Sequence, residues 1–95
     1  MSYQLILHSA AENDLSDLSQ RLQRDVVFKH LPKIVAAPYK SGIPKRGKLS
    51  KLRGYNFGPK GGYRIVYTIL AERRQVMVIA IGAHDQAYRR AERRV

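Results

Sequence analysis

The segment from Lys51 to Ile69 constrains the fold most, because it holds the longest run of strand-forming residues in the chain. Its second half, residues 62–70 (GYRIVYTIL), carries β-branched and aromatic side chains on both faces of an extended backbone. A strand that is apolar on both faces belongs in the middle of a sheet, with packing on each side. We therefore predict that residues 63–70 form a central strand.

Arg64 is the one charged residue in this run. An arginine on a central strand is costly unless it is paired or reaches the surface of a cleft. One hypothesis is that Arg64 projects from the sheet into an anion-binding groove. The other is that Arg64 is salt-bridged at the start of the strand, beside the turn at Gly61 and Gly62. The residue pattern alone leaves both open.

The rest of the chain predicts an α+β fold with the element order β-α-α-β-β-β-α. Strands are expected at residues 3–7, 49–57, 63–70 and 75–81, and helices from residue 9, over 21–37 and over 86–94. The last three strands would form an antiparallel meander. The two N-terminal helices would cover one face of this small antiparallel sheet. Residues 38–49 show no periodicity and are predicted to be a loop.

Local signals refine these helices. Ser9 and Glu12 have the spacing of a capping box, and the charge of Asp14 suits the positive end of the helix dipole. Pro32 deletes a backbone hydrogen bond, so we expect a kink or break just before it. Asp85 is a plausible cap for the last helix.

Length and composition limit the protein class. The 95 residues suffice for one domain, to which we assign residues 1–95. The chain has no cysteine, which excludes disulfides and cysteine-based metal sites. No stretch approaches the roughly 18 apolar residues of a membrane span, and the N-terminus lacks a secretory pattern. We expect a soluble cytoplasmic protein.

Charge is the strongest compositional feature. Lys and Arg number 18 against 7 Asp and Glu, which gives a net charge of +11, and no acidic residue lies between Asp25 and Glu72. A second basic cluster closes the chain at Arg89, Arg90, Arg93 and Arg94. Such a field favours polyanionic partners: nucleic acid, an acidic protein or an anionic membrane. No basic stretch shows the wide apolar helical face of a membrane-binding helix. A solvated basic surface without a partner is the alternative.

Four short motifs follow one another in a recognisable order. They are residues 51–54 (KLRG), 62–67 (GYRIVY), the strand end 80–82 (AIG) and 84–89 (HDQAYR). In this order, and at these distances from the C-terminus, the motifs resemble the RelE/ParE superfamily of toxins from bacterial and archaeal toxin–antitoxin systems. The RelE-like branch is the closer match, because the chain keeps a Gly-x-His-x-x-x-Tyr-Arg pattern after the last apolar strand.

This resemblance implies a RelE-like fold and a toxin that inhibits translation by cleaving mRNA in the ribosomal A site, with no metal and no cofactor. The family's reaction activates a ribose 2′-hydroxyl against the adjacent phosphate, leaving a cyclic phosphate and a free 5′-hydroxyl. Such a reaction needs a base, cations for the developing charge and an acid for the leaving oxygen. The implied partners are an acidic antitoxin, the ribosome with its mRNA and, through the antitoxin complex, operator DNA.

The resemblance also implies roles for individual residues. Arg64 matches the arginine that stabilises the phosphate, and Tyr88 matches a tyrosine that orients or activates the 2′-hydroxyl. His84 falls where many members carry a basic residue, and a histidine there could act as acid or base. RelE members place lysines on the strand before Gly-Tyr-Arg; here Lys51 and Lys60 flank that strand and are the substitutes. The candidate RNA contacts are Lys45, Arg46, Lys48, Arg53, Arg89 and Arg90.

Structural explanations without chemistry compete with these roles. Tyr88 could simply anchor the last helix, and His84 could be an ordinary residue at its start; we assign no role to His8 or His30. At the level of the whole protein, a ParE-like inhibitor would act on a topoisomerase (gyrase) through contacts alone. A basic RNA-binding relative without catalysis is the third hypothesis.

Overall fold

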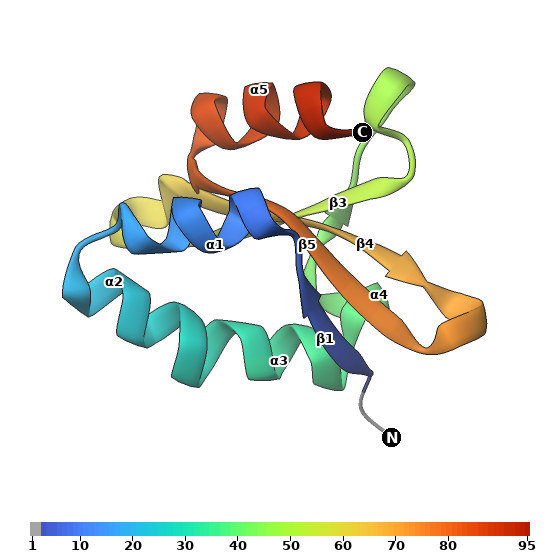
Figure 1. Ribbon diagram of the computed structural model, residues 1–95, viewed down its shortest axis with the longest axis horizontal. Helices are drawn as coiled ribbons and strands as arrows, with labels where there is room; N and C mark the ends of the chain where they lie inside the picture. The colour runs from blue at the N-terminus through green and yellow to red at the C-terminus, as the bar shows by residue number, and fades with distance from the viewer. Residues whose placement is uncertain (1–2) are drawn as a thin grey trace.

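The computed structural model describes residues 3–95. Its five strands form one sheet in the order β1-β5-β4-β3-β2, with β4 at its centre (Figure 1). The strands are β1 (Gln4–Leu7), β2 (Ile43–Pro44), β3 (Leu52–Phe57), β4 (Tyr63–Leu70) and β5 (Gln75–Ala83). The predicted central strand and the antiparallel meander β3-β4-β5 are confirmed. The pairing of β1 with β5 is parallel, so the sheet is only mostly antiparallel.

Helices cover both faces of the sheet (Figure 1). The N-terminal helices pack on one face and α5 packs on the other, which confirms the predicted α+β layering and gives the second face its cover. Their bounds are α1 (Ser9–Ser16), α2 (Gln20–Asp25), the π-helical turn η1 (Val26–His30), α3 (Leu31–Ala36), the short α4 (Pro38–Ser41) and α5 (His84–Arg94).

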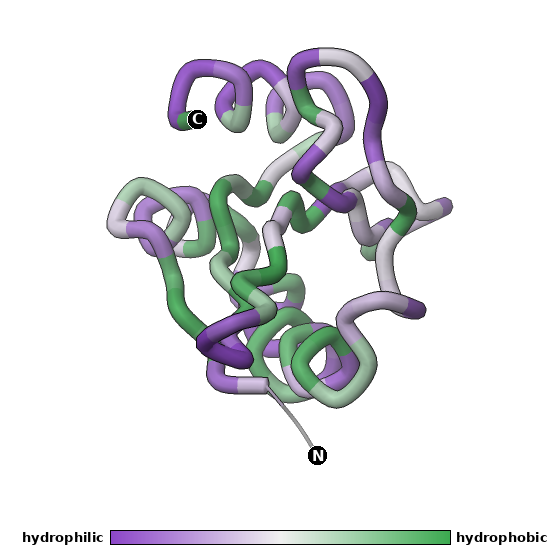
Figure 2. Tube along the Cα trace, turned by 90° about the vertical axis from the view of Figure 1, so that its right-hand side faces the viewer, coloured by the Kyte–Doolittle hydropathy of each residue, from purple (hydrophilic) through white to green (hydrophobic). Residues whose placement is uncertain are grey.

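The sheet separates two apolar cores. The larger one lies under the N-terminal helices and includes Ile34, Phe57 and Tyr67; the smaller one lies under α5 and includes Val66 and Ala87. Figure 2 shows the hydrophobic segments gathered between the helical layers, whereas most of α5 is hydrophilic. Side chains from the two faces of β4 pack into the two cores. The strand is therefore apolar on both faces because each face is covered, as predicted.

Three local predictions need correction. Residue 9 is the first residue of α1 and not its cap; His8 is the N-cap and its Nδ1 accepts the amide hydrogen of Ala10 at 3.1 Å. Asp85 lies inside α5, whose N-cap is Ala83 with no side-chain hydrogen bond. Residues 38–49 are not an irregular loop: they contain α4, β2 and the turn η2 (Gly47–Leu49). Such short elements leave no periodicity for a sequence pattern to detect.

Pro32 changes the helix geometry instead of breaking the helix. Just before it, the Leu31 N–H bonds to the Val26 carbonyl, which is the i to i−5 pattern of a π turn. Pro32 then occupies the first turn of α3, where its missing N–H is tolerated. The irregularity predicted near this proline is therefore present as a π turn.

Asp14 is a structural residue and not a surface charge near a helix end. Its side chain is only 4% exposed and lies where β5 extends beyond β1. It accepts the Ile81 N–H at 3.0 Å and both terminal nitrogens of Arg94 at 2.6 and 3.1 Å. Arg90 approaches the same carboxylate at 3.1 Å. This cluster fastens α5 to α1 across the edge of the sheet.

Candidate active site

Arg64 lies near the start of β4, on the face that carries α5. Residues two apart on a strand share a face, and Val66 belongs to the core under α5. Arg64 Nη1 donates hydrogen bonds to the carbonyls of Gly61 and Tyr63, the latter at 3.0 Å. Within residues 3–95, no carboxylate forms a salt bridge with Arg64. The turn therefore orients this guanidinium and leaves its charge without a counter-ion.

The start of α5 meets the same turn. The His84 N–H donates to the Gly62 carbonyl at 3.0 Å, which places the helix beside the segment that leads into Arg64. The His84 ring packs edge-on against the Tyr88 ring, 5.1 Å between centroids. His84 Nδ1 lies 2.7 Å from Asp85 Oδ1, and both side chains are exposed. A solvent-accessible imidazole with a carboxylate partner suits proton transfer.

Tyr88 reaches the sheet at Gly54. A β-carbon added at Gly54 would clash with Tyr88 Oη and lie 3.1 Å from Lys45 Cε. Lys45 Nζ lies 4.4 Å from the centroid of the Tyr88 ring. Gly54 is paired with Val66 on β4 and with Ile43 on β2. The site thus gathers a cation, a tyrosine and a histidine over the α5 face of the sheet.

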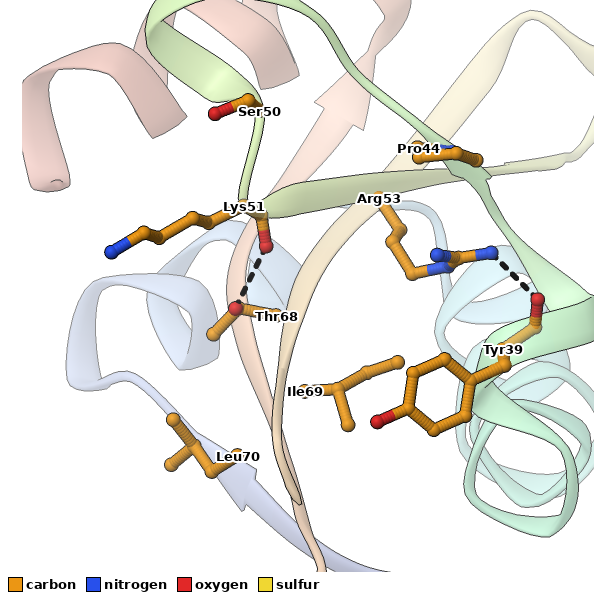
Figure 3. A pocket seen from close by; sticks show the side chains of 8 residues that line it. All are labelled: Tyr39, Pro44, Ser50, Lys51, Arg53, Thr68, Ile69 and Leu70. Carbon is orange, nitrogen blue, oxygen red and sulfur yellow. Dashed lines mark hydrogen bonds between the residues drawn. The ribbon is translucent and has the colours of Figure 1, made fainter. Parts of the chain in front are cut away.

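The two other predicted catalytic residues lie at the edges of this arrangement. Lys60 occupies the hairpin turn between β3 and β4 with a positive φ of 54°, and its side chain is exposed. Lys51 precedes β3, where its carbonyl accepts a hydrogen bond from Thr68 at 2.9 Å. In Figure 3 its side chain extends away from Arg53. In the described part of the chain, neither lysine forms a hydrogen bond or ion pair with His84 or Tyr88.

Arg53 points to the opposite face from its neighbour Gly54, because successive strand residues alternate. Its Nη2 donates to the carbonyls of Tyr39 at 2.6 Å and Gly42 at 3.1 Å, so it ties α4 to the sheet. This arginine and Tyr39 line a groove of about 340 Å³, and Figure 3 shows both side chains. Tyr67 lies beneath, where burial raises the pKa of its hydroxyl. Arg53 thus lies apart from the face of His84 and Tyr88.

The remaining predicted RNA contacts fall into two groups. Arg90 is used internally, because Nη1 donates to the Ile81 carbonyl at 2.8 Å and approaches Asp14. Arg46 and Lys48 are exposed around the turn η2, and Arg89 is exposed on α5. The turn η2 contacts α5, and Arg89 lines a surface pocket together with His84 and Tyr88.

Two features of the site escaped the sequence reasoning. The first is the close packing of Tyr88 on Gly54. A glycine inside a strand often marks a place where another group approaches the backbone closely, so the sequence did contain a signal for it. The second is the contact of Lys45 with Tyr88. No local pattern predicts it, because the two residues are 43 positions apart. Among residues 3–95, no group of three or more His, Cys, Asp or Glu side chains is arranged to hold a metal ion. None of the described helices has the length and apolar character needed to cross a membrane.

The sheet order, the two helical layers and the α5 face together define the RelE-like α+β fold. A mutant of the Escherichia coli toxin RelE in the free state superposes with a TM-score of 0.82 at 24% identity, covering 100% of this chain and 99% of that one. The toxin–antitoxin complex RelBE2 from Mycobacterium tuberculosis matches with a TM-score of 0.80 at 24% identity, covering 88% of this chain and 100% of that one. The archaeal RelE–RelB complex from Pyrococcus horikoshii matches with a TM-score of 0.62 at 16% identity, over 87% and 96%.

The sequence comparison agrees with the fold. A family model described as the ParE-like toxin of type II bacterial toxin–antitoxin systems matches residues 5–92. No curated protein sequence matches the chain. The chain belongs to this RelE/ParE family of type II toxins.

Proposed function

We propose that this toxin is a ribosome-dependent mRNA endoribonuclease that inhibits translation in the cytoplasm. The observation that carries the proposal is the position of Arg64. Its guanidinium has no carboxylate partner among residues 3–95, and the turn that holds it also bonds the first residue of α5, the helix of His84 and Tyr88. An oriented arginine without a carboxylate partner, in the turn that bonds the start of the helix of His84 and Tyr88, suits a reaction at a phosphate.

In the proposed reaction, the ribose 2′-hydroxyl attacks the adjacent phosphate and the 5′-oxygen leaves. Arg64 stabilises the charge on the phosphorane oxygens. Tyr88 orients the 2′-hydroxyl, and His84 gives a proton to the leaving oxygen. The proton of the 2′-hydroxyl passes to a general base, for which Lys51 and Lys60, at either end of β3, are the candidates. No metal and no cofactor takes part.

The proposed RNA path follows the solvent-accessible cations around α5. Lys45, Arg46, Lys48 and Arg89 border the site and attract phosphates without sequence preference. Arg53 and Arg90 are committed to internal contacts, and we therefore propose structural roles for them in place of RNA contacts.

An acidic antitoxin is the proposed protein partner. Structures similar to this chain include complexes of RelE with RelB, and a net charge of +11 is complementary to an acidic chain. Operator DNA would be reached through such a complex. An acidic open reading frame directly beside the gene would support this proposal.

Two other functions keep a specific observation in their favour. The family model carries the name of ParE-like toxins, which favours an inhibitor that binds a topoisomerase (gyrase). The absence of a lysine on β3 (LRGYNF) removes the cations that RelE members place there, which favours an RNA-binding relative without catalysis.

Expression from a tightly regulated promoter separates the three functions. Cuts at codon spacing in cellular mRNA support the nuclease. Intact mRNA with arrested replication supports the topoisomerase inhibitor, and unimpaired growth supports the inactive relative. Arg64→Ala should abolish the cuts while the protein stays folded. The matched control is Arg73→Ala, which removes an exposed arginine at the other end of the meander. Undiminished cutting by Arg64→Ala would remove Arg64 from the site.

A further inference from the structure

The hydroxyl of Tyr88 is buried and has no hydrogen-bond partner among residues 3–95. It occupies the space that Gly54 leaves by lacking a side chain, since a β-carbon there would clash with Oη and lie 3.1 Å from Cζ. Buried polar groups in native proteins are nearly always paired. An unpaired hydroxyl in a candidate active site is therefore a group that is open to pairing with a substrate.

Lys45 covers the same tyrosine. Its Nζ lies 4.4 Å from the ring centroid, a distance at which the cation is attracted to the negative face of the ring. Its Cε would lie 3.1 Å from a β-carbon at Gly54, so the lysine, the glycine and the phenol share one small volume. The ring of Tyr88 is held between its helix, the sheet and this lysine.

The sheet fixes the backbone of Lys45. Its N–H donates to the Leu52 carbonyl at 2.9 Å, immediately after Ile43 and Pro44 pair with Gly54 and Arg53. Lys45 is half-buried, whereas Lys51 and Lys60 are exposed. It is thus the lysine that the fold places against Tyr88.

We propose that Lys45 is the positioning residue for Tyr88. In the free protein its ammonium lies over the ring and keeps the hydroxyl seated on Gly54. With the ring held in that place, the hydroxyl, which has no partner among residues 3–95, pairs with the ribose of the bound RNA. This inference rests on the nuclease function proposed above and deepens it. Lys45 acts through Tyr88 and takes no part in bond making or breaking.

The contact itself is tested by NMR on protein with 13C-labelled tyrosine rings, in which Tyr88→Phe assigns one of the six signals. Lys45→Met keeps the aliphatic chain and removes the charge, and it should shift the Tyr88 signal; Lys45→Arg should return it toward the wild-type position. The matched control is Lys33→Met, because Lys33 Nζ lies 5.9 Å over the Tyr55 ring. That control should shift Tyr55 and leave Tyr88 unmoved. If the Tyr88 signal keeps its chemical shift in Lys45→Met, the proposal is overturned.

The positioning role is tested by single-turnover cleavage of ribosome-bound mRNA. Lys45→Met should lower the maximal rate about 10- to 100-fold, the loss that a misplaced catalytic group causes. Lys45→Arg should restore most of the rate, and Lys33→Met should leave it unchanged. In a Tyr88→Phe background, Lys45→Met should cost little more.

Contrary outcomes are distinct. If Lys45→Met only raises the ribosome concentration at half-saturation, and its effect multiplies with that of Tyr88→Phe, then Lys45 is a plain phosphate contact and the positioning role is refuted. If wild-type protein does not cleave, the nuclease function fails, and the positioning role fails with it. The NMR spectra then report only a structural contact.

Discussion

Two buried tyrosine hydroxyls in this protein should respond differently to the same chemical change. Tyr67 Oη donates to the Pro38 carbonyl at 2.7 Å in a fully buried position. Tyr88 Oη is also buried but lacks a partner among residues 3–95. The substitutions Tyr67→Phe and Tyr88→Phe each remove one oxygen atom and keep the ring.

The expected changes in the free energy of unfolding follow from the hydrogen bonds that each oxygen makes. Tyr67→Phe loses a hydrogen bond and strands the Pro38 carbonyl, which costs about 1–3 kcal/mol. Tyr88→Phe loses no hydrogen bond and relieves an unpaired buried hydroxyl, so it should be neutral or stabilise the fold by about 1 kcal/mol. For a domain of this size, 1 kcal/mol corresponds to a change in Tm of about 4–8 °C.

The assay is thermal or urea unfolding of both variants beside the wild type, followed by circular dichroism. Tm should fall clearly for Tyr67→Phe, and it should stay level or rise for Tyr88→Phe. The Tyr88 variant should at the same time lose nuclease activity, which separates function from stability at this residue. Equal losses of Tm in both variants would refute the reasoning, because they would show that Tyr88 is hydrogen-bonded in solution.

Three further predictions concern the rest of the fold. Asp14→Ala leaves two half-buried arginines without their carboxylate and should lower the free energy of unfolding by about 3–5 kcal/mol in urea titration, whereas exposed Asp17→Ala should change it by less than about 0.5 kcal/mol. Burial, followed by the charge of the neighbouring lysine, lowers the pKa of His30, so the folded state binds fewer protons than the unfolded state. The free energy of unfolding should therefore fall as the pH drops through 6.5 and level off below the folded pKa. His30→Gln should flatten that dependence, and an unchanged pH profile would contradict it. Gly54→Ala should lower Tm, and pairing it with Tyr88→Phe should recover part of the loss; strictly additive effects would argue against the clash.

The parts of the fold that were predictable are those specified by short-range patterns. The run YRIVYTIL is apolar on both faces, and it is the central strand β4. The apolar run QVMVIAI follows after a short polar turn, so its antiparallel pairing with β4 could be anticipated. Pro32 predicted an irregular helix because proline has no backbone N–H to donate.

The parts that were not predictable depend on contacts between distant residues. The parallel pairing of β1 with β5 joins Leu5 to Val76, and nothing local selects that partner. Asp14 looks like any acidic residue early in a helix until β5 and α5 bring Ile81 and Arg94 to it.

The candidate site divides in the same way. The residue pattern left Arg64 either in a groove or in a salt bridge; among residues 3–95 the structure shows no salt bridge for it and ties it to the carbonyls of its own turn. The resemblance to RelE/ParE toxins pointed to His84 and Tyr88, which the structure places in contact with each other. The contact of Lys45 with Tyr88 could not be predicted, because only the packing of α5 on the sheet shows which lysine meets the tyrosine.

The activity proposed for this toxin is cleavage of mRNA on the ribosome by attack of a ribose 2′-hydroxyl. The most direct measurement incubates the purified protein with a defined mRNA, alone and bound in the A site of a programmed ribosome, and identifies the ends of the products. The account predicts cleavage only on the ribosome, with a cyclic phosphate on one fragment and a 5′-hydroxyl on the other, and none with Arg64→Ala. Intact mRNA on ribosomes saturated with folded wild-type protein would contradict it.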